Sequence, residues 1–310
     1  MMNSSLFLLS LSAGMALGII FTGAPRTVCF GPGGEEIKLC AAKISAKSGA
    51  ETKVVLTNGN ERELRRVRAL MYGREYAEKG IDGTGKAALT VGIDAVGEAL
   101  QSCEAAIVVA DPSSGPPTDG ALRAIFGNAP NLRHVALLST LGGGKSSGFF
   151  TKALTRGEMQ LSALGQQYNK VSTSIIRVGN VKGGGPGMIE RKGANAGKAI
   201  TDFGLDKYYY DTFGDLAQAT LTMAYDQFTM GANVLLGDPL SMPNPFQAAF
   251  NAQSFDPISE ECNRVAAATA LVAAVRRRQG GEFTISAAEA TSPPSIDNMI
   301  RAFDQAATLS

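Results

Sequence analysis

The chain has 310 residues, of which 45% are hydrophobic and 18% charged, and its formal net charge is +1. This length and apolar content allow a full hydrophobic core and argue against intrinsic disorder, and the near-zero net charge argues against a nucleic-acid binder. Four cysteines without a short-spaced pair exclude a disulfide scaffold and a zinc ribbon. The single histidine excludes a histidine-rich metal site and disfavours a Ser-His-Asp triad, so no metal is expected.

The first 25 residues carry no charged side chain and contain an apolar run from Leu6 to Phe21. As a helix this run of 16 residues would be about 24 Å long, slightly less than the roughly 30 Å of a bilayer core. It fits a targeting segment that is removed, because small residues follow it, and it also fits a membrane anchor or a helix packed on the domain. We therefore treat residues 1–25 as a separate segment.

Apolar runs of four to six residues alternate with segments of helical spacing as far as residue 178. This pattern predicts strands at 27–30, 53–57, 87–91, 105–110, 134–138 and 173–178, and helices at 35–47, 61–76, 94–100, 118–126 and 149–164. Continuous apolar strands that alternate with helices are typical of a parallel sheet covered on both faces. The fold class is therefore predicted to be α/β, with a doubly wound, Rossmann-like sheet over residues 26–182.

The last third of the chain has a looser pattern, beginning with a flexible glycine turn at 183–187. Helices are expected at 213–227, at 257–279 and from Ser295 onward, and strands at 232–236 and 283–285. The alanine-rich segment 257–279 has glutamates at 260 and 261 and arginines at 276–278, the charge order that a helix dipole favours. We expect residues 183–310 to form a smaller lobe over the carboxyl ends of the strands, which completes the same globular unit.

Glycines join the first predicted strand to the first predicted helix, at Gly31, Gly33 and Gly34. In this position a helix N-terminus offers free N–H groups and a favourable dipole to a pyrophosphate. The turn therefore predicts a dinucleotide site, and the alternative is a capped helix without a ligand.

Three features of this turn oppose tight phosphate binding. Pro32 lacks an N–H group, and Glu35 and Glu36 place negative charge at the helix start. Ile37 stands where a third glycine would allow close packing of helix on strand.

The second strand ends near Asn58 without an acidic residue that would hold a ribose diol. Arg62 follows, and its guanidinium suits a 2′-phosphate, so NADP is favoured over NAD as the cofactor. For Arg62 the alternative is a solvated residue at a helix start.

Several stretches resemble, in their order, the atypical short-chain dehydrogenase/reductase superfamily and its NmrA-like members. They are 28–34, 106–111, 133–140, 156–164 and 174–185, followed by Asp215-Leu216-Ala217 at a helix start. The resemblance covers about residues 27–240. It implies NAD(P) binding, with Ala110 and Asp111 beside the cofactor, and it extends to plastid members that act in photosystem assembly.

The resemblance also implies a Ser or Thr that polarises a substrate carbonyl and a Tyr-x-x-x-Lys pair on the next helix. Ser139 or Thr140 matches the first role, and Lys152 matches the lysine, which would also hold the nicotinamide ribose. Gly148 stands where the tyrosine belongs, and general acid catalysis worth about 10²–10⁴-fold would be lost without it. Lys152 also fits a plain surface lysine. The tyrosines 208–210 offer another donor, although such runs more often pack an interface.

Three further residues have predicted roles that do not depend on catalysis. His134 directly precedes a buried strand, so it is expected to be structural. Cys29 lies within the first strand and is expected to be a buried, inert thiol. Arg177 ends a core strand, where it either anchors the following loop near the cofactor or pairs with a carboxylate.

The favoured function is a non-catalytic homologue that acts as a nucleotide-sensing, scaffold or assembly protein. Its expected partners are proteins of an organellar membrane complex, with a plastid or thylakoid location, and no nucleic acid. The alternatives are an active NADPH-dependent reductase with a nonstandard proton donor, and a purely structural subunit. NADP(H) binding and weak or absent binding are both left open.

Overall fold

The computed structural model describes residues 24–31, 35–56, 60–80, 87–90, 93–110, 117–141, 149–168, 170–186, 204–239 and 261–308. The predicted targeting or anchor segment falls almost wholly outside these ranges, as do Gly33, Gly34, Asn58 and Asp111. Within the described ranges, no helix has the length and apolar character needed to cross a membrane.

One eight-stranded sheet forms the centre of the molecule, in the order β3-β2-β1-β4-β5-β6-β10-β8. All neighbouring strands are parallel except β8, which is antiparallel to β10. The strands are β1 (Thr27–Phe30), β2 (Thr52–Val55), β3 (Ala87–Thr90), β4 (Ala105–Val109), β5 (His134–Thr140), β6 (Ser172–Val178), β8 (Gly231–Leu236) and β10 (Gly281–Ala288). The first six strands have the doubly wound order, so the predicted Rossmann-like α/β fold class is confirmed.

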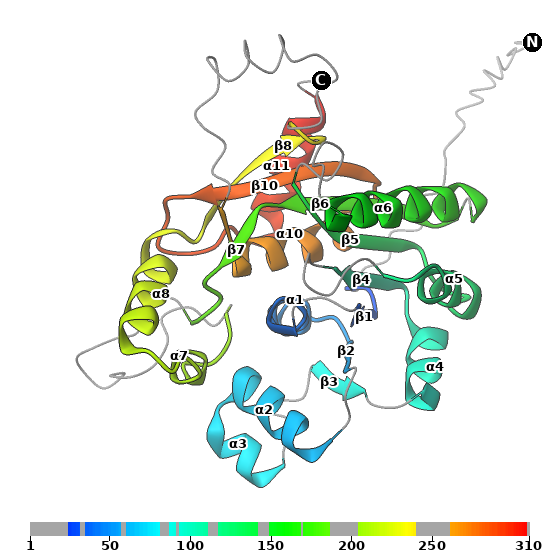
Figure 1. Ribbon diagram of the computed structural model, residues 1–310. Helices are drawn as coiled ribbons and strands as arrows, with labels where there is room; N and C mark the ends of the chain where they lie inside the picture. Colours follow the sequence, from blue (N-terminus) through cyan, green and yellow to red (C-terminus); the bar gives the residue numbers. More distant parts are fainter. Residues whose placement is uncertain are drawn as a thin grey trace, which may run out of the picture.

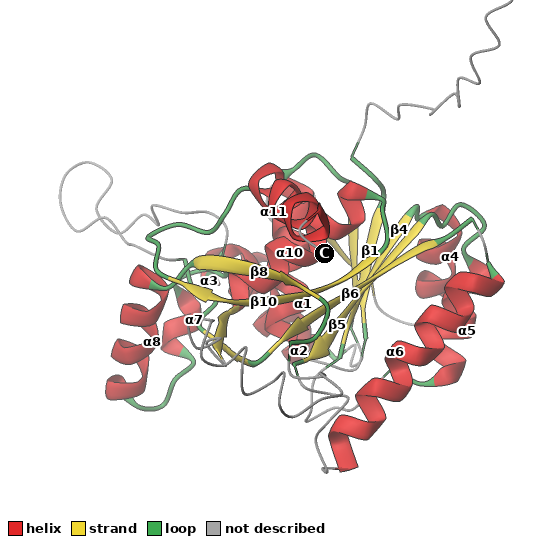
Figure 2. Ribbon diagram, turned by 90° about the horizontal axis from the view of Figure 1, so that it is seen from above, coloured by secondary structure: helices red, strands yellow, loops and turns green. Residues whose placement is uncertain are grey.

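Helices cover both faces of this sheet (Figures 1 and 2). One face packs against α1 (Glu35–Lys47), α2 (Glu61–Tyr72), α10 (Arg264–Arg277) and α11 (Ile296–Thr308). The other face packs against α4 (Ile93–Ser102), α5 (Asp119–Asn128) and α6 (Phe149–Gln167). The remaining elements are α3 (Arg74–Lys79), α7 (Tyr208–Asp211), α8 (Leu216–Phe228) and a small parallel pair, β7 (Asn180–Lys182) with β9 (Glu261–Asn263).

Helix α10 is almost entirely enclosed, with all residues from Val265 to Val275 buried. It packs beside α1 and over β4, β5 and β6, and its alanines allow this close approach. The prediction placed the helix start at residue 257, and this was wrong. The helix begins at Arg264, because the Asn263 side chain accepts a hydrogen bond from Val265 N (2.8 Å), and Glu261 lies in β9.

The last third of the chain contributes β8, β10 and α10 to the central layers, so β10 is a long core strand and not the short one expected at 283–285. The boundary at residue 182 stays a prediction. The helix expected over 61–76 is divided into α2 and α3 at Gly73, whose φ of +97° interrupts helical geometry.

Candidate functional site

The carboxyl ends of neighbouring strands bring three predicted site residues to one edge of the sheet. Gly31 follows β1, Ala110 follows β4 and Thr140 ends β5, and these strands are paired in the order β1, β4, β5. Gly31 has a φ of +123°, and a Cβ atom there would lie 2.3 Å from the carbonyl oxygen of Val109. The position therefore requires glycine, as the tight turn of a dinucleotide site does.

Lys38 lies directly behind this turn and was not identified from the sequence. Its side chain is 1% exposed, and its Nζ donates a hydrogen bond to the carbonyl oxygen of Gly31 (3.0 Å). An ammonium group at this place adds positive charge near the N-terminus of α1, where a phosphate would bind. Its signal in the sequence is weak: a single lysine between apolar residues of the first helix.

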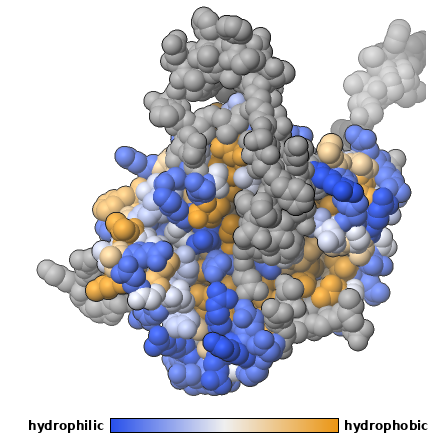
Figure 3. Space-filling view, viewed as in Figure 1, coloured by the Kyte–Doolittle hydropathy of each residue, from blue (hydrophilic) through white to orange (hydrophobic). Residues whose placement is uncertain are grey.

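The negative charge at the start of α1 is partly balanced. Glu36 accepts a hydrogen bond from Arg66 of α2 (Oε1 to Nη2, 3.1 Å), and Arg66 also binds Glu63 (3.1 Å). The repulsion of phosphate expected from Glu36 is therefore weaker than its position in the sequence indicates. Arg62 is exposed in the first turn of α2. Figure 3 shows a hydrophilic surface at the bottom of the view, where α2 and α3 (Arg74–Lys79) lie in Figure 1.

The predicted catalytic residues are only partly placed by the structure. Ser139 is 1% exposed, and its Oγ has no hydrogen-bond partner among the described residues. Thr140 is half-buried at the end of β5. Lys152 belongs to α6, but its side chain lies outside the described part, so the structure does not show whether it reaches Ser139.

Arg177 lies next to Ser139 on β6 and binds two carboxylates. Its Nε and Nη2 donate to the two carboxylate oxygens of Glu158 (3.1 and 3.0 Å), and Nη2 also donates to Glu282 (2.9 Å). Burial alone would lower the pKa of Arg177, but these carboxylates outweigh burial and raise it. Of the two predicted roles, the structure shows carboxylate pairing.

The glycine run after β7 was predicted to be a flexible turn, and this was wrong. Residues 183–186 are buried, and Asp226 accepts hydrogen bonds from Gly184 N (2.8 Å) and Gly185 N (3.0 Å). A Cβ atom on Gly183 would lie 2.1 Å from Asp226 Oδ1. The glycines therefore permit dense packing around a buried carboxylate.

Two tyrosines of the 208–210 run complete this buried cluster. Tyr210 donates its hydroxyl hydrogen bond to Asp226 Oδ2 (3.0 Å). The Tyr209 hydroxyl donates to Gly183 O (3.3 Å) and accepts from Arg264 Nη1 (2.7 Å). Burial raises the pKa of both tyrosines. Their hydroxyls hold the glycine loop and are not exposed proton donors.

Asp226 is the centre of the cluster and has four donors. Asn263 Nδ2 (3.2 Å) joins the two glycine amides and Tyr210. Burial raises the pKa of Asp226, although the hydrogen bonds from Gly184 and Gly185 work in the opposite direction.

Two buried groups have the structural roles predicted for them. His134 is 1% exposed, with Nδ1 lying 2.5 Å from Ser172 Oγ and Nε2 3.1 Å from Ser174 Oγ. Cys29 is fully buried, and burial raises the pKa of its thiol to about 12, so it stays protonated. Among the described residues, no group of three or more His, Cys, Asp or Glu side chains has the arrangement of a metal site.

We expect His134 to make stability depend on pH. Burial, followed by the charges of Arg277 and Arg278, lowers its pKa to about 4 from the ordinary histidine value of 6.5. Between these values the unfolded chain binds more protons than the folded chain, so stability falls as the pH drops, by up to about 3 kcal/mol in total. Urea denaturation at about pH 7 and about pH 4.5 checks this, with His134→Gln as the variant that loses the effect. An equal acid-induced loss in both proteins would contradict the assignment.

No family model and no curated protein matches the chain. Solved structures do match, among them vestitone reductase from alfalfa, with 11% identity and a TM-score of 0.37 over 51% of this chain and 57% of that chain. NmrA, a negative transcriptional regulator solved with NADP, matches with 9% identity and a TM-score of 0.36 over 51% of this chain and 46% of that one. UDP-N-acetylglucosamine 4-epimerase from Bacillus cereus matches with 10% identity and a TM-score of 0.44 over 85% of this chain and 77% of that one.

The matched part of this chain spans little more than half of vestitone reductase and less than half of NmrA. Identities this low concern the fold alone. All three TM-scores are below 0.5. The plastid part of the resemblance stays a prediction.

Proposed function

We propose that this chain binds NADP(H) at the carboxyl edge of its sheet and acts as a nucleotide-sensing, scaffold or assembly protein, not as a classical reductase. The observation that carries the nucleotide part is the Gly31 turn, where glycine is required by both φ and the backbone of Val109. The fold places this turn at the carboxyl edge of the sheet, where doubly wound proteins bind nucleotides.

The residues around the turn suit an NADP molecule. The N-terminus of α1 and the Lys38 ammonium provide positive potential for the pyrophosphate, and Arg62 provides a guanidinium for the 2′-phosphate. Ala110 and Thr140 border the same edge. When bound, NADP(H) would supply the chemistry of hydride transfer.

The buried cluster around Asp226 supports a role without classical turnover. The Tyr209 hydroxyl is hydrogen-bonded to Gly183 and Arg264, and the Tyr210 hydroxyl is hydrogen-bonded to Asp226. If Tyr209 or Tyr210 acted as the proton donor, it would have to break these hydrogen bonds and leave its partners unsatisfied in the interior. The sequence also has glycine at position 148, where the resemblance expects tyrosine.

The partners and location are inferred from the sequence. We propose protein partners in an organellar membrane complex, with the thylakoid as the membrane. The support is the apolar segment 1–25 together with the resemblance to plastid assembly proteins.

Arg62→Ala is expected to raise the Kd for NADPH by at least about tenfold and to leave the weaker binding of NADH unchanged. The reason is that a charge-assisted hydrogen bond to phosphate is worth about 1.5–3 kcal/mol, and NADH lacks the 2′-phosphate. Calorimetric titration of both nucleotides measures the effect. Arg65→Ala is the matched control, because Arg65 is also exposed on α2, three residues later. Equal losses in the two variants would reject a specific role for Arg62.

One observation favours the second candidate, an NADPH-dependent reductase. The buried Ser139 Oγ has no partner among the described residues, as expected of a donor that awaits a substrate carbonyl. Steady oxidation of NADPH with a carbonyl compound, abolished by Ser139→Ala, would establish this function in place of the first.

A further inference from the structure

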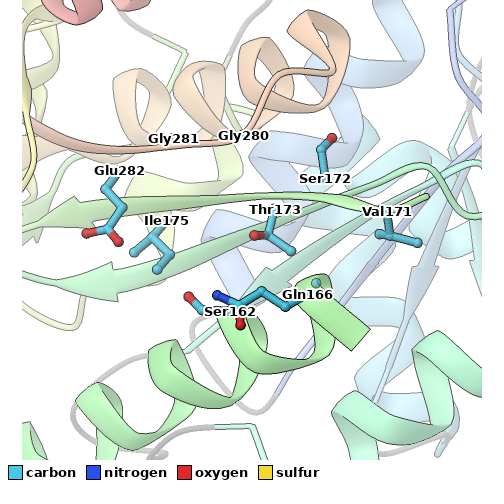
Figure 4. A pocket seen from close by; sticks show the side chains of 10 residues that line it. Ser162, Gln166, Val171, Ser172, Thr173, Ile175, Gly280, Gly281 and Glu282 are labelled. Atoms are coloured by element: carbon cyan, nitrogen blue, oxygen red, sulfur yellow. The ribbon is translucent and has the colours of Figure 1, made fainter. Parts of the chain in front are cut away.

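A hollow of about 380 Å³ lies between the C-terminal part of α6, the start of β6 and the Gly280–Gly281 turn (Figure 4). Its described lining has one ionic side chain, Glu282, which is paired with Arg177 (Oε2 to Nη2, 2.9 Å). No aromatic ring belongs to that described lining, so the hollow lacks the groups that usually select a ligand. A more specific surface is found on α8.

Helix α8 exposes a stripe of four apolar residues, the α8 stripe: Ala217, Leu221, Ala224 and Phe228. Leu221 is 72% exposed and Phe228 is 56% exposed. Spacings of four, three and four residues place the stripe on one side of the helix, whereas the buried Ala219 and Asp226 lie on the opposite side. Figure 3 shows hydrophobic surface on the left of the view, where α8 lies in Figure 1.

The exposed side of α8 carries no charge. Asp226 is the only Asp, Glu, Lys or Arg from Leu216 to Phe228, and its side chain is buried. The hydroxyl of Thr220 donates to the carbonyl oxygen of Leu216 (2.8 Å), so it is satisfied within the helix. A helix that binds a membrane surface usually has Lys or Arg beside its apolar residues, and α8 has neither. The stripe therefore fits an uncharged, apolar protein surface.

The α8 stripe is complementary to itself. When two copies pair with antiparallel helices about a two-fold axis, Leu221 of one copy lies opposite Ala224 of the other, and Phe228 lies opposite Ala217. Each large side chain then meets a small one, which allows close helix packing. A parallel pair would instead place leucine against leucine and phenylalanine against phenylalanine.

The helix dipoles favour the same arrangement. In an antiparallel pair, the positive N-terminal end of each helix lies beside the negative C-terminal end of the other. Asp215 caps the N-terminus, and it precedes the buried Ala219 by four residues, so it lies on the side away from the stripe. Its carboxylate is therefore kept away from the second copy.

Helix α8 is held in place before a second copy binds, and its size predicts a weak contact. Asp226 ties the helix to the amides of Gly184 and Gly185 and to the Tyr210 hydroxyl. An ordered surface loses little entropy on association. With 13 residues, α8 is about 20 Å long, and one face of such a helix buries less than the roughly 1,200–2,000 Å² of a stable interface.

We propose that two copies of this chain associate reversibly through antiparallel pairing of α8, with the α8 stripe as the contact. The expected Kd is roughly 10–100 μM, as suits a small apolar interface. The contact uses no residue of the proposed nucleotide site, so the dimer forms with or without NADP(H).

Sedimentation velocity of the full chain over a concentration series tests this pairing. Ala224→Leu should raise the Kd of the dimer at least about tenfold, because two leucines then oppose each other at both symmetric contacts. Adding Leu221→Ala to this variant exchanges the large and the small residue, so it should restore the Kd to within about threefold of that of the unmodified chain. Leucine and alanine both favour helix, so the variants are expected to fold.

Met159→Ala is the matched control, since Met159 is an apolar residue of α6 that is 62% exposed, and its dimer should be unchanged. A chain that stays monomeric would overturn the proposal, as would association that Ala224→Leu leaves unchanged, including association through residues 1–25. A double variant as weak as Ala224→Leu alone would reject the antiparallel pairing. A monomer whose binding to phosphatidylcholine vesicles is abolished by Leu221→Ser would assign the stripe to a lipid surface instead.

Discussion

Replacing Asp226 with alanine is expected to lower the free energy of unfolding by roughly 3–5 kcal/mol, because several buried donors lose their common acceptor. The side chain is fully buried and accepts hydrogen bonds from two backbone amides, Tyr210 and Asn263. Each donor left unsatisfied in the interior costs about 1–3 kcal/mol. Removal of a carboxylate whose pKa is raised by burial recovers only part of this loss.

Urea denaturation with Asp215→Ala as a control separates the buried cluster from an ordinary aspartate effect. Asp215 is exposed and caps α8 by accepting from Ala217 N (2.8 Å), so its loss should cost about 1 kcal/mol. Similar small effects in both variants would show that the 183–186 loop is not held by Asp226.

Gly31→Ala is expected to destabilise the chain by roughly 3–5 kcal/mol and to abolish NADPH binding. A φ of +123° is unfavourable for alanine, and the added Cβ would meet Val109 O at 2.3 Å and Val109 N at 2.8 Å. Relief of this contact would require β1 and β4 to separate, and β1 is paired with β4 along its full length.

Gly49→Ala is the matched control for the glycine effect. Gly49 also has a positive φ, of +94°, but a Cβ atom there has open space around it. It should therefore show only the backbone strain, about 1 kcal/mol. Equal destabilisation in the two variants would mean that the Gly31 turn is not tightly packed on β4.

Most strands and helices of the doubly wound sheet follow from the sequence, because buried parallel strands are continuous apolar runs such as Ala105–Val109. The direction of β8 does not follow, since a short apolar strand has the same composition whether parallel or antiparallel. The start of α10 was misplaced because it is set by the Asn263 cap and by the pairing of β9 with β7, a strand about 80 residues earlier in the chain.

In the candidate site too, features set by residues close in the sequence could be predicted, and features set by contacts between distant residues could not. Gly31 is predictable because its requirement arises at a strand end followed by a helix. The packing of the 183–186 loop is not predictable from the sequence, because its partners Asp226 and Arg264 lie about 40 and 80 residues later in the chain. The balance of Glu36 by Arg66, 30 residues away, depends likewise on the packing of α2 against α1.

We propose that the Gly31 turn, with Lys38 behind it, retains dinucleotide binding despite the acidic start of α1. The most direct measurement is a calorimetric titration of NADPH, followed by NADH, into the full chain. We expect NADPH to bind in the micromolar range or tighter, and NADH to bind at least roughly tenfold more weakly because it lacks the 2′-phosphate. No heat of binding for either nucleotide up to millimolar concentration would contradict it.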